Sequence, residues 1–341
     1  MIRVMRYSII LSLGMFVSAQ HFELPGEVTK VGTAAANWLK LDTGARGIAM
    51  GGAQTAAGEG MSGVPYNPAN ITFMQGSSTY YSKTNYLLGI SHNVLAYGSN
   101  ISPNNYIGLH LFYLDSGAME ITTEAFPDGT GADFHFLGIA FRGTYARVMT
   151  DRLKVGASIK YVREQIHTTH MQTFALDIGS NFDTGIYGFH LGMSVSNFGP
   201  EIQYTGEGLE MPVDEDVSVD SALAKVTEKF SLPLTFRLGI KNDIMSKTSM
   251  FMPNEEHRVT VALDGINPID FTTYGGMGVE YAWRETAFIR AGTRLGHDTA
   301  KFTFGAGAQI KTGGITIGMD YAYANFSILE DTHQFAISLG F

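Results

Sequence analysis

Two short groups of residues have types and spacings that could hold a cofactor or a metal ion. Residues 58–63 read GEGMSG and match the G-x-G-x-x-G pattern of dinucleotide sites. Such a site needs a strand before the glycines and a helix after them, and Pro65 stands where that helix should run. His167 and His170 are three residues apart, a spacing that points them to opposite faces of a strand. We therefore interpret residues 58–63 as a glycine turn and expect no cofactor.

A third group alternates oxygen-bearing residues between positions 214 and 220, as a calcium loop would. Val219 occupies the position that needs glycine, and Lys225 stands where a bidentate Glu is required. A loosely bound divalent ion on the outer surface is the alternative to a solvated acidic loop. The sequence has no G-x-S-x-G elbow, and the absence of Cys excludes disulfides and thiolate metal sites. We expect no resident metal and no enzymatic activity.

The composition suits a barrel in a membrane better than a soluble enzyme. Charged residues make up 16% of the 341-residue chain, against about 25% in a typical soluble domain. The net charge is −9 and the sequence has no basic block, which argues against nucleic acid as a partner. With so few charges, much of the surface must be apolar, and outer-membrane lipid is the expected neighbour.

The first nineteen residues are typical of a secretory signal peptide. Arg3 and Arg6 form a short positive region, followed by an apolar run over 7–17. Val17-Ser18-Ala19 is a small-residue cleavage site, so residues 1–19 are predicted to be removed. The apolar run is too short to span a bilayer as a helix, which takes about 20 residues. The mature chain is therefore predicted to be exported.

From residue 76 to residue 341 the sequence is a series of alternating segments separated by turn residues. The clearest run, over 232–241, places Leu, Phe and Ile on one face and Thr, Arg, Gly and Lys on the other. This pattern is typical of a transmembrane barrel and predicts an all-β fold with about fourteen antiparallel strands. The predicted strands begin near Tyr80, Leu88, Ile107, Phe136, Leu153, Phe174, Tyr187, Leu234, Val259, Met277, Ala287, Phe302, Ile315 and Phe335.

The charges in these segments fall on the face opposite the aliphatic and aromatic side chains. A Lys or Arg that faces lipid at mid-bilayer costs about 2–4 kcal/mol, so these charges are predicted to point into the barrel. Basic residues outnumber acidic ones, which could favour anions or neutralise carboxylates of the interior segment and the loops. The predicted lumen charges are Arg142, Lys154, Lys160, Asp177, Arg237, Lys241, Arg258, Asp264, Glu280, Arg290, Arg294 and Asp320.

Residues 20–75 have a different pattern. Residues 42–53 are rich in small side chains and have no period of two, and Asn67-Pro68 indicates a turn. Because small side chains allow close packing, this segment is predicted to lie inside the barrel as a plug. Arg46 would then meet one of the lumen carboxylates; a flexible periplasmic tail is the alternative. The predicted plug residues are Gly44, Ala45, Arg46, Met50, Gly51, Gly52, Asn67 and Pro68.

The long connection over 199–231 contains apolar residues at helical spacing. Val219, Leu223, Val226 and Phe230 recur across 218–230 and predict a short amphipathic helix at the barrel mouth. Its apolar face would cover the lumen entrance, a lipophilic ligand or a partner protein. Simple packing of a lid against the barrel is the alternative.

Several blocks of the chain resemble a known family of outer-membrane proteins. Residues 31–40 (VGTAAANWLK), 44–46 (GAR), 50–53 (MGGA) and 67–69 (NPA) look like the opening of the PorV/PorQ family, a branch of the FadL-like barrels. The resemblance continues to the last residues, SLGF, and so covers nearly the whole mature chain. It implies a fourteen-stranded barrel with an N-terminal plug in the outer membrane of a Gram-negative bacterium.

Two functions from different classes follow from this resemblance. The PorV/PorQ branch implies an accessory protein of type IX secretion, which would hold exported cargo proteins or secretion components at its outer loops. The FadL likeness implies a passive channel for hydrophobic small molecules, captured under the predicted loop helix near Leu223, Val226 and Phe230. We take the first as the main interpretation and the second as the alternative.

Overall fold

The computed structural model describes residues 31–211, 223–297, 301–326 and 331–341. The predicted signal peptide, residues 1–19, lies outside these ranges. Among the described residues, no helix combines the length and the apolar character needed to cross a bilayer.

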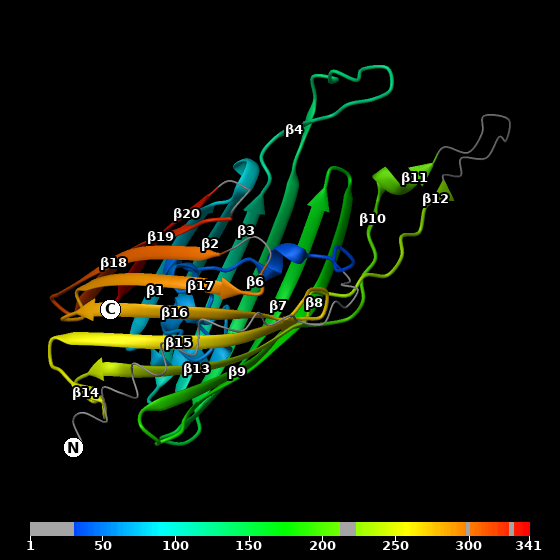
Figure 1. Ribbon diagram of the computed structural model, residues 1–341. Coiled ribbons are helices and arrows are strands. Elements are labelled where there is room, and N and C mark those ends of the chain that lie inside the picture. The colour runs from blue at the N-terminus through cyan, green and yellow to red at the C-terminus, as the bar shows by residue number, and fades with distance from the viewer. Residues whose placement is uncertain (1–30, 212–222, 298–300, 327–330) are drawn as a thin grey trace.

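Fourteen strands form a closed antiparallel barrel, as the sequence predicts (Figure 1). The ring closes because β1 pairs with β20 along its whole length, and β9 joins β8 to β13. The strands are β1 (Ser77–Asn85), β2 (Ser91–Ser102), β3 (Asn105–Asp115), β6 (Phe136–Val148), β7 (Leu153–Ile166), β8 (Thr169–Asp183), β9 (Phe189–Phe198), β13 (Thr235–Ser246), β15 (His257–Pro268), β16 (Tyr274–Trp283), β17 (Ala287–Leu295), β18 (Phe302–Thr312), β19 (Ile315–Ala324) and β20 (Thr332–Gly340).

Short connections gather at one end of the barrel and longer ones at the other. Residues 103–104, 284–286 and 313–314 are tight turns, whereas 116–135 and 199–234 are long loops at the opposite end. The long loops carry the hairpins β4 (Met119–Glu120) with β5 (Asp133–Phe134) and β11 (Glu210–Met211) with β12 (Leu223–Ala224), which project beyond the ring (Figure 1). The two-residue strands β10 (Thr205–Gly206) and β14 (Met252–Pro253) extend the sheet at its margins.

Several predicted boundaries differ from the structure, and the largest difference is at β8, which begins at Thr169 rather than near Phe174. The second strand begins at Ser91 rather than near Leu88, because residues 87–89 form a 3-10 turn, η4 (Leu87–Gly89). The seventh begins at Phe189, after the turn that contains Tyr187.

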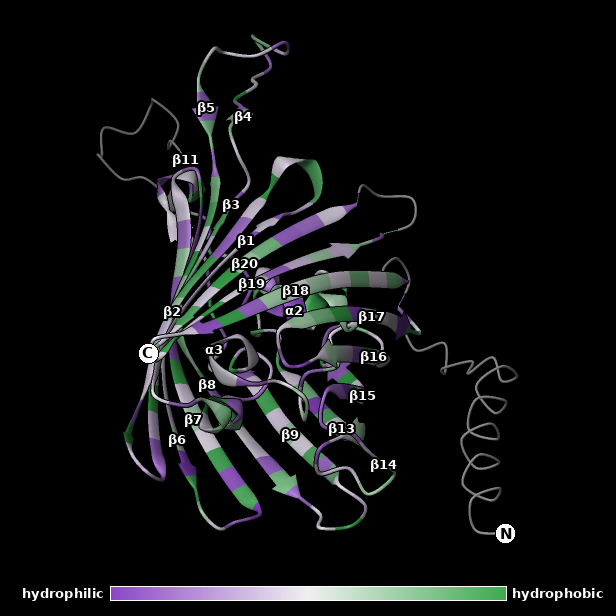
Figure 2. Cartoon of the chain, turned by 90° about the vertical axis from the view of Figure 1, so that its left-hand side faces the viewer, coloured by the Kyte–Doolittle hydropathy of each residue, from purple (hydrophilic) through white to green (hydrophobic). Residues whose placement is uncertain are grey.

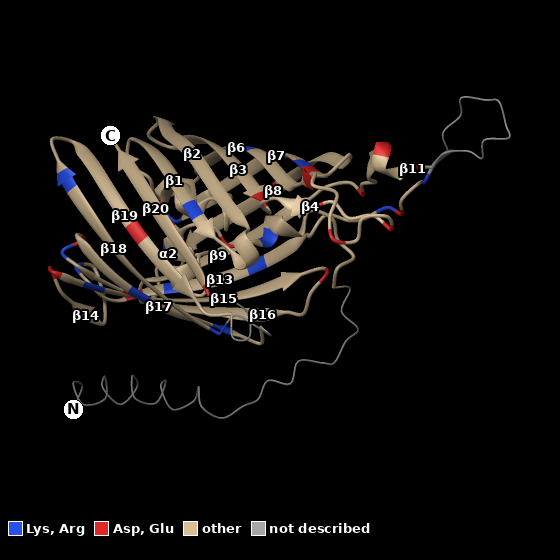
Figure 3. Ribbon diagram, turned by 90° about the horizontal axis from the view of Figure 1, so that it is seen from above, with Lys and Arg blue, Asp and Glu red and all other residues tan. Residues whose placement is uncertain are grey.

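The outer face of the barrel is apolar, as contact with lipid requires. Large side chains such as Leu109, Phe141, Ile159 and Phe174 are exposed on the strands, and Figure 2 shows hydrophobic residues alternating with polar ones along them. Figure 3 shows much of the strand surface free of acidic and basic residues.

Some charges depart from the predicted one-sided pattern; Lys83 and Arg147, for example, are exposed on β1 and β6. Both lie within three residues of a strand end, where a long basic side chain can reach the interface. A closed, even-numbered antiparallel barrel with an apolar exterior is the architecture of bacterial outer-membrane proteins. The protein is therefore an outer-membrane barrel of a Gram-negative bacterium, as the sequence predicts.

The N-terminal segment that precedes β1 consists of short helical turns enclosed by the strands (Figure 2). Asn67 caps the last of these turns by accepting a hydrogen bond from the backbone N–H of Ala69, and Pro68 occupies its first position. The turns are η2 (Asn37–Lys40), α2 (Ala45–Ala49), α3 (Gly60–Gly63) and η3 (Pro68–Phe73).

Candidate functional site

The N-terminal segment fits closely against glycines of the barrel wall. A Cβ added at Gly292 would lie 2.3 Å from the backbone nitrogen of Gly51, and one at Gly156 would lie 2.6 Å from the carbonyl carbon of Pro68. Larger residues are therefore excluded at these wall positions, because backbone of the segment occupies the space. The same holds at Gly192, Gly276 and Gly278. At Gly179, Gly239 and Gly305, side-chain atoms of the segment come within 3 Å of the added Cβ.

Arg46 joins the segment to the wall through Glu280. Its Nε donates to Glu280 Oε2 at 2.8 Å, and Arg290 Nε and Arg258 Nη1 donate to the same carboxylate at 2.6 and 2.9 Å. The Glu280 side chain is only 1% exposed, so this carboxylate is neutralised by guanidinium groups rather than by water. Burial lowers the pKa of Arg46, but Glu280 and Glu59 raise it more, and the net shift is upward.

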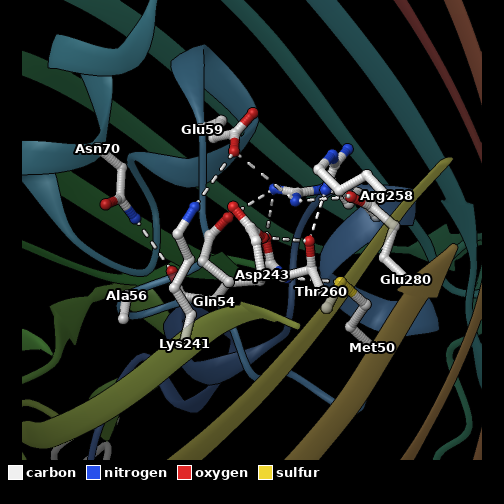
Figure 4. A network of polar contacts seen from close by, with 12 residues as sticks. Met50, Gln54, Ala56, Glu59, Asn70, Lys241, Asp243, Arg258, Thr260 and Glu280 are labelled. Atoms are coloured by element: carbon white, nitrogen blue, oxygen red, sulfur yellow. Dashed lines mark hydrogen bonds and ion pairs between the residues drawn. The ribbon is translucent and has the colours of Figure 1, made fainter. Parts of the chain in front are cut away.

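Further ionic contacts surround this carboxylate, and Figure 4 shows how several of the side chains converge. Arg290 also pairs with Asp320, and Arg258 also pairs with Glu285. We call this set the balanced cluster, because its four cations face four carboxylates. Its members are Arg46, Lys241, Arg258, Arg290, Glu59, Glu280, Glu285 and Asp320.

A second set of charges lies on other strands. Asp177 pairs with Lys160 at 2.8 Å and with Arg142 at 3.2 Å. Asp42, from the N-terminal segment, pairs with Arg294 and lies 4.0 Å from Arg237. We call this set the cationic cluster, because four cations face two carboxylates. Its members are Arg142, Lys160, Arg237, Arg294, Asp42 and Asp177.

The two remaining predicted lumen charges also contact the segment. Asp264 Oδ2 accepts hydrogen bonds from the backbone N–H groups of Gln54 and Thr55 at 2.9 and 2.8 Å. Lys154 Nζ lies 3.6 Å from the centre of the Phe73 ring, a cation–π contact. The structure thus brings wall residues from strands far apart in sequence onto one segment.

A cavity of about 340 Å³ opens at the end of the barrel that carries the long loops. Leu41 and Ile48 of the N-terminal segment line its inner side. Tyr86, Phe271 and Phe326 contribute aromatic rings from three loops, and Tyr274 contributes one from the start of β16. We call this space the outer cavity. Its volume falls within the range of about 300–1,000 Å³ that is typical of small-molecule sites.

The aromatic rings of the outer cavity contact one another. Phe271 and Tyr274 lie 5.6 and 5.1 Å from the ring of His297, and Tyr86 packs edge-on against Phe326 at 5.8 Å. Burial raises the pKa of the Tyr86 phenol, so this ring stays neutral. Most of these rings belong to loop residues, and Tyr274 is the first residue of β16. They lie outside the regular alternation from which the strands were predicted, and their aromatic type next to turn residues was the available signal.

The cations that line the outer cavity are paired with carboxylates. Arg294 pairs with Asp42, and Lys40 Nζ lies 2.5 Å from Asp270 Oδ2. Paired charges next to aromatic and aliphatic surface favour a ligand without a net charge. Within the described part of the chain, no group of three or more His, Asp or Glu residues could hold a metal ion.

The predicted helix over 218–230 is wrong where the structure describes it. Leu223 and Ala224 form β12, which pairs with β11, and Phe230 forms an antiparallel bridge with Ile202. Val226, predicted to face inward, is 82% exposed. Helical spacing alone does not form a helix when a neighbouring extended segment satisfies the same backbone groups by pairing. Val219 and the possible ion site over 214–220 lie outside the described residues.

The fold is similar to solved outer-membrane barrels of the FadL type. The toluene transporter TodX of Pseudomonas putida matches with a TM-score of 0.57 and 13% identity, over 88% of this chain and 97% of TodX. The monoaromatic hydrocarbon channel CymD matches with a TM-score of 0.55 and 12% identity, over 87% and 96%. A FadL homologue of Pseudomonas aeruginosa matches with a TM-score of 0.51 and 11% identity, over 87% and 97%. At these identities the similarity concerns the fold.

No protein-family model matches the sequence, and a search of curated proteins finds no relative. The resemblance to the PorV/PorQ branch therefore remains a prediction.

Proposed function

We propose that the protein is a passive channel for small hydrophobic molecules and that the outer cavity is where they first bind. The observation that carries this proposal is a cavity of about 340 Å³, lined largely by aromatic and aliphatic side chains, at the outer end of a membrane barrel. Transfer of apolar surface from water into such a cavity gains about 25 cal/mol per Å².

The proposed substrate class is a neutral compound with an aromatic or aliphatic body. Phe271, Tyr274 and His297 offer ring edges and faces at stacking distance, and the cations nearby are already paired. The structural relatives support this choice, because two of them are named as a toluene transporter and a monoaromatic hydrocarbon channel.

We propose that the N-terminal segment acts as the plug of this channel. Its backbone contacts wall glycines on many strands, and Arg46 and Asp42 connect it to the wall through ion pairs. Leu41 and Ile48 form the floor of the outer cavity, so a bound molecule meets the segment first. Onward movement therefore requires the segment or the wall beside it to shift.

A role in type IX secretion, which was the main interpretation from the sequence, is less well supported than a channel function. It relied on long outer loops as a protein-binding surface and on the PorV/PorQ resemblance. The hairpins β4–β5 and β11–β12 do extend beyond the barrel, but no contact among the described residues favours a protein partner over solvent. The outer cavity, in contrast, matches a small hydrophobic ligand in size and chemistry.

The experiment measures uptake of labelled toluene by cells that contain the protein in their outer membrane and by the same cells without it. The variant Phe271→Asp places a charge in the outer cavity and should lower uptake about tenfold at low substrate concentration. Phe126→Asp is the matched control, because Phe126 is 60% exposed on a loop at the same end and does not line the cavity. Equal uptake by wild type and Phe271→Asp, or no uptake above cells without the protein, would reject the proposal.

A further inference from the structure

A second, much smaller cavity of about 30 Å³ lies next to the outer cavity, between the N-terminal segment and the barrel wall. Leu41, Asp42 and His92 line both spaces. The smaller cavity is also lined by Tyr66 from the segment and by Arg142 and Arg237 from the wall. It has room for a particle about the size of a water molecule.

Both guanidinium groups that line this small cavity have N–H groups without a hydrogen-bond acceptor in the described part of the chain. Among the described residues, Arg142 Nε and Nη1 and Arg237 Nη1 are buried and have no hydrogen-bond partner. The two side chains are only 6% and 8% exposed. A buried donor without a partner costs about 1–3 kcal/mol, and more when the group is charged. These groups therefore favour an acceptor placed between them.

Neutral donors point to the same conclusion. Tyr66 Oη and His92 Nε2 are buried, line the small cavity and have no hydrogen-bond partner within the described ranges. Each can donate one hydrogen bond, the imidazole in the tautomer that carries its proton on Nε2. An acceptor in the cavity would thus meet donors from two arginines and two neutral side chains.

The charge around the small cavity is also unbalanced. Four cations of the cationic cluster face two carboxylates, Asp42 and Asp177. Counting Asp264 on the neighbouring strand, which already accepts two backbone N–H groups, the excess is still one positive charge. Buried charge of one sign is stable only when it is paired. A monovalent anion in the cavity would balance this excess charge, whereas a neutral molecule would not.

We propose that the small cavity binds one small monovalent inorganic anion, of the size of chloride. The arginine planes are held in place before the ion arrives, because Arg142 lies 4.9 Å from the centre of the Phe112 ring and Arg237 lies 5.4 Å from that of Tyr66. The bound ion neutralises the cationic cluster and fastens the N-terminal segment to the wall by accepting a hydrogen bond from the hydroxyl group of Tyr66. Binding of the ion at this site does not require that the protein transports hydrophobic molecules.

Bromide replaces chloride in the test because its anomalous X-ray scattering identifies it. Crystals of the wild-type protein grown in sodium bromide should show one anomalous peak between Arg142 and Arg237. In detergent solution at constant ionic strength, replacing gluconate with increasing concentrations of chloride should raise the Tm until the site is saturated. The variant Arg237→Gln should weaken the apparent chloride affinity at least tenfold.

Arg258→Gln is the matched control, because Arg258 belongs to the balanced cluster and pairs with Glu280 and Glu285. It should lower the Tm but keep the wild-type dependence on chloride. No bromide peak in the cavity, or the same chloride dependence in Arg237→Gln as in wild type, would overturn the proposal. Elongated density that enters the outer cavity from this site would also overturn it, because the occupant would then be the carboxylate of a larger ligand. Since the crystallographic test uses wild-type protein, it does not depend on whether a variant folds.

Discussion

The balanced cluster and the cationic cluster lie in the same lumen but differ in how the N-terminal segment completes them. In the balanced cluster, the segment supplies a cation, Arg46, and a carboxylate, Glu59, and four cations face four carboxylates. In the cationic cluster, it supplies one carboxylate, Asp42, to a basic wall, and four cations face two carboxylates. The first arrangement attaches the segment through the chain's own residues, whereas the second leaves capacity to bind an anion.

The largest effect should come from the centre of the balanced cluster. Glu280→Ala leaves three guanidinium groups without their shared carboxylate, and we expect it to lower the free energy of unfolding by about 3–5 kcal/mol. Urea unfolding in lipid vesicles measures the change. Glu285→Ala is the control, because this carboxylate is 49% exposed and pairs only with Arg258; its expected effect is about 1 kcal/mol or less.

A pair of arginine variants compares the clusters directly in chloride-free buffer. Arg290→Met removes a cation from balanced surroundings and leaves Asp320 without its partner, so we expect a loss of about 3–5 kcal/mol. Arg142→Met removes an excess cation, and Asp177 keeps Lys160, so we expect a loss about 2 kcal/mol smaller. Equal losses in the same unfolding assay would mean that the charge excess has no energetic consequence.

The close fit between the N-terminal segment and the wall glycines should contribute to the stability of the folded protein. Gly156→Ala places a Cβ against the backbone of Pro68, and we expect a loss of about 1–3 kcal/mol. Gly143→Ala on the neighbouring strand is the control, because the nearest atom to its added Cβ is 3.9 Å away. Thermal unfolding of both variants, followed by circular dichroism, tests this. If the Gly156→Ala protein is as stable as the control, the backbone of the segment near Pro68 can move away from the added Cβ at little cost in free energy.

The smallest effect should come from the rim of the balanced cluster. Glu59 is 48% exposed, and its carboxylate lies 3.7 Å from Lys241 and 4.0 Å from Arg46. Exposed pairs at such distances contribute about 1 kcal/mol or less, so Glu59→Gln should barely change the unfolding midpoint. If Glu59→Gln lowers the free energy of unfolding as much as Glu280→Ala does, Glu59 contributes as much to the cluster as Glu280, which would contradict this prediction.

The sequence by itself determined the barrel. The alternation of side chains with period two is a local property of each strand, so the fourteen strands could be located without knowledge of their neighbours. The small residues over 42–53 likewise indicated close packing of that segment, although not against which glycines.

Only the tertiary structure decided which charges meet and where a ligand can bind. Arg46 and Glu280 are 234 positions apart, and their pairing depends on how the segment is placed relative to strand register around the whole ring. The outer cavity depends in the same way on loops that meet only when the barrel closes. Over 223–230 the spacing of apolar residues predicted a helix, but Leu223, Ala224 and Phe230 pair with neighbouring extended segments instead. Local patterns specify the element, whereas contacts between distant elements specify the site.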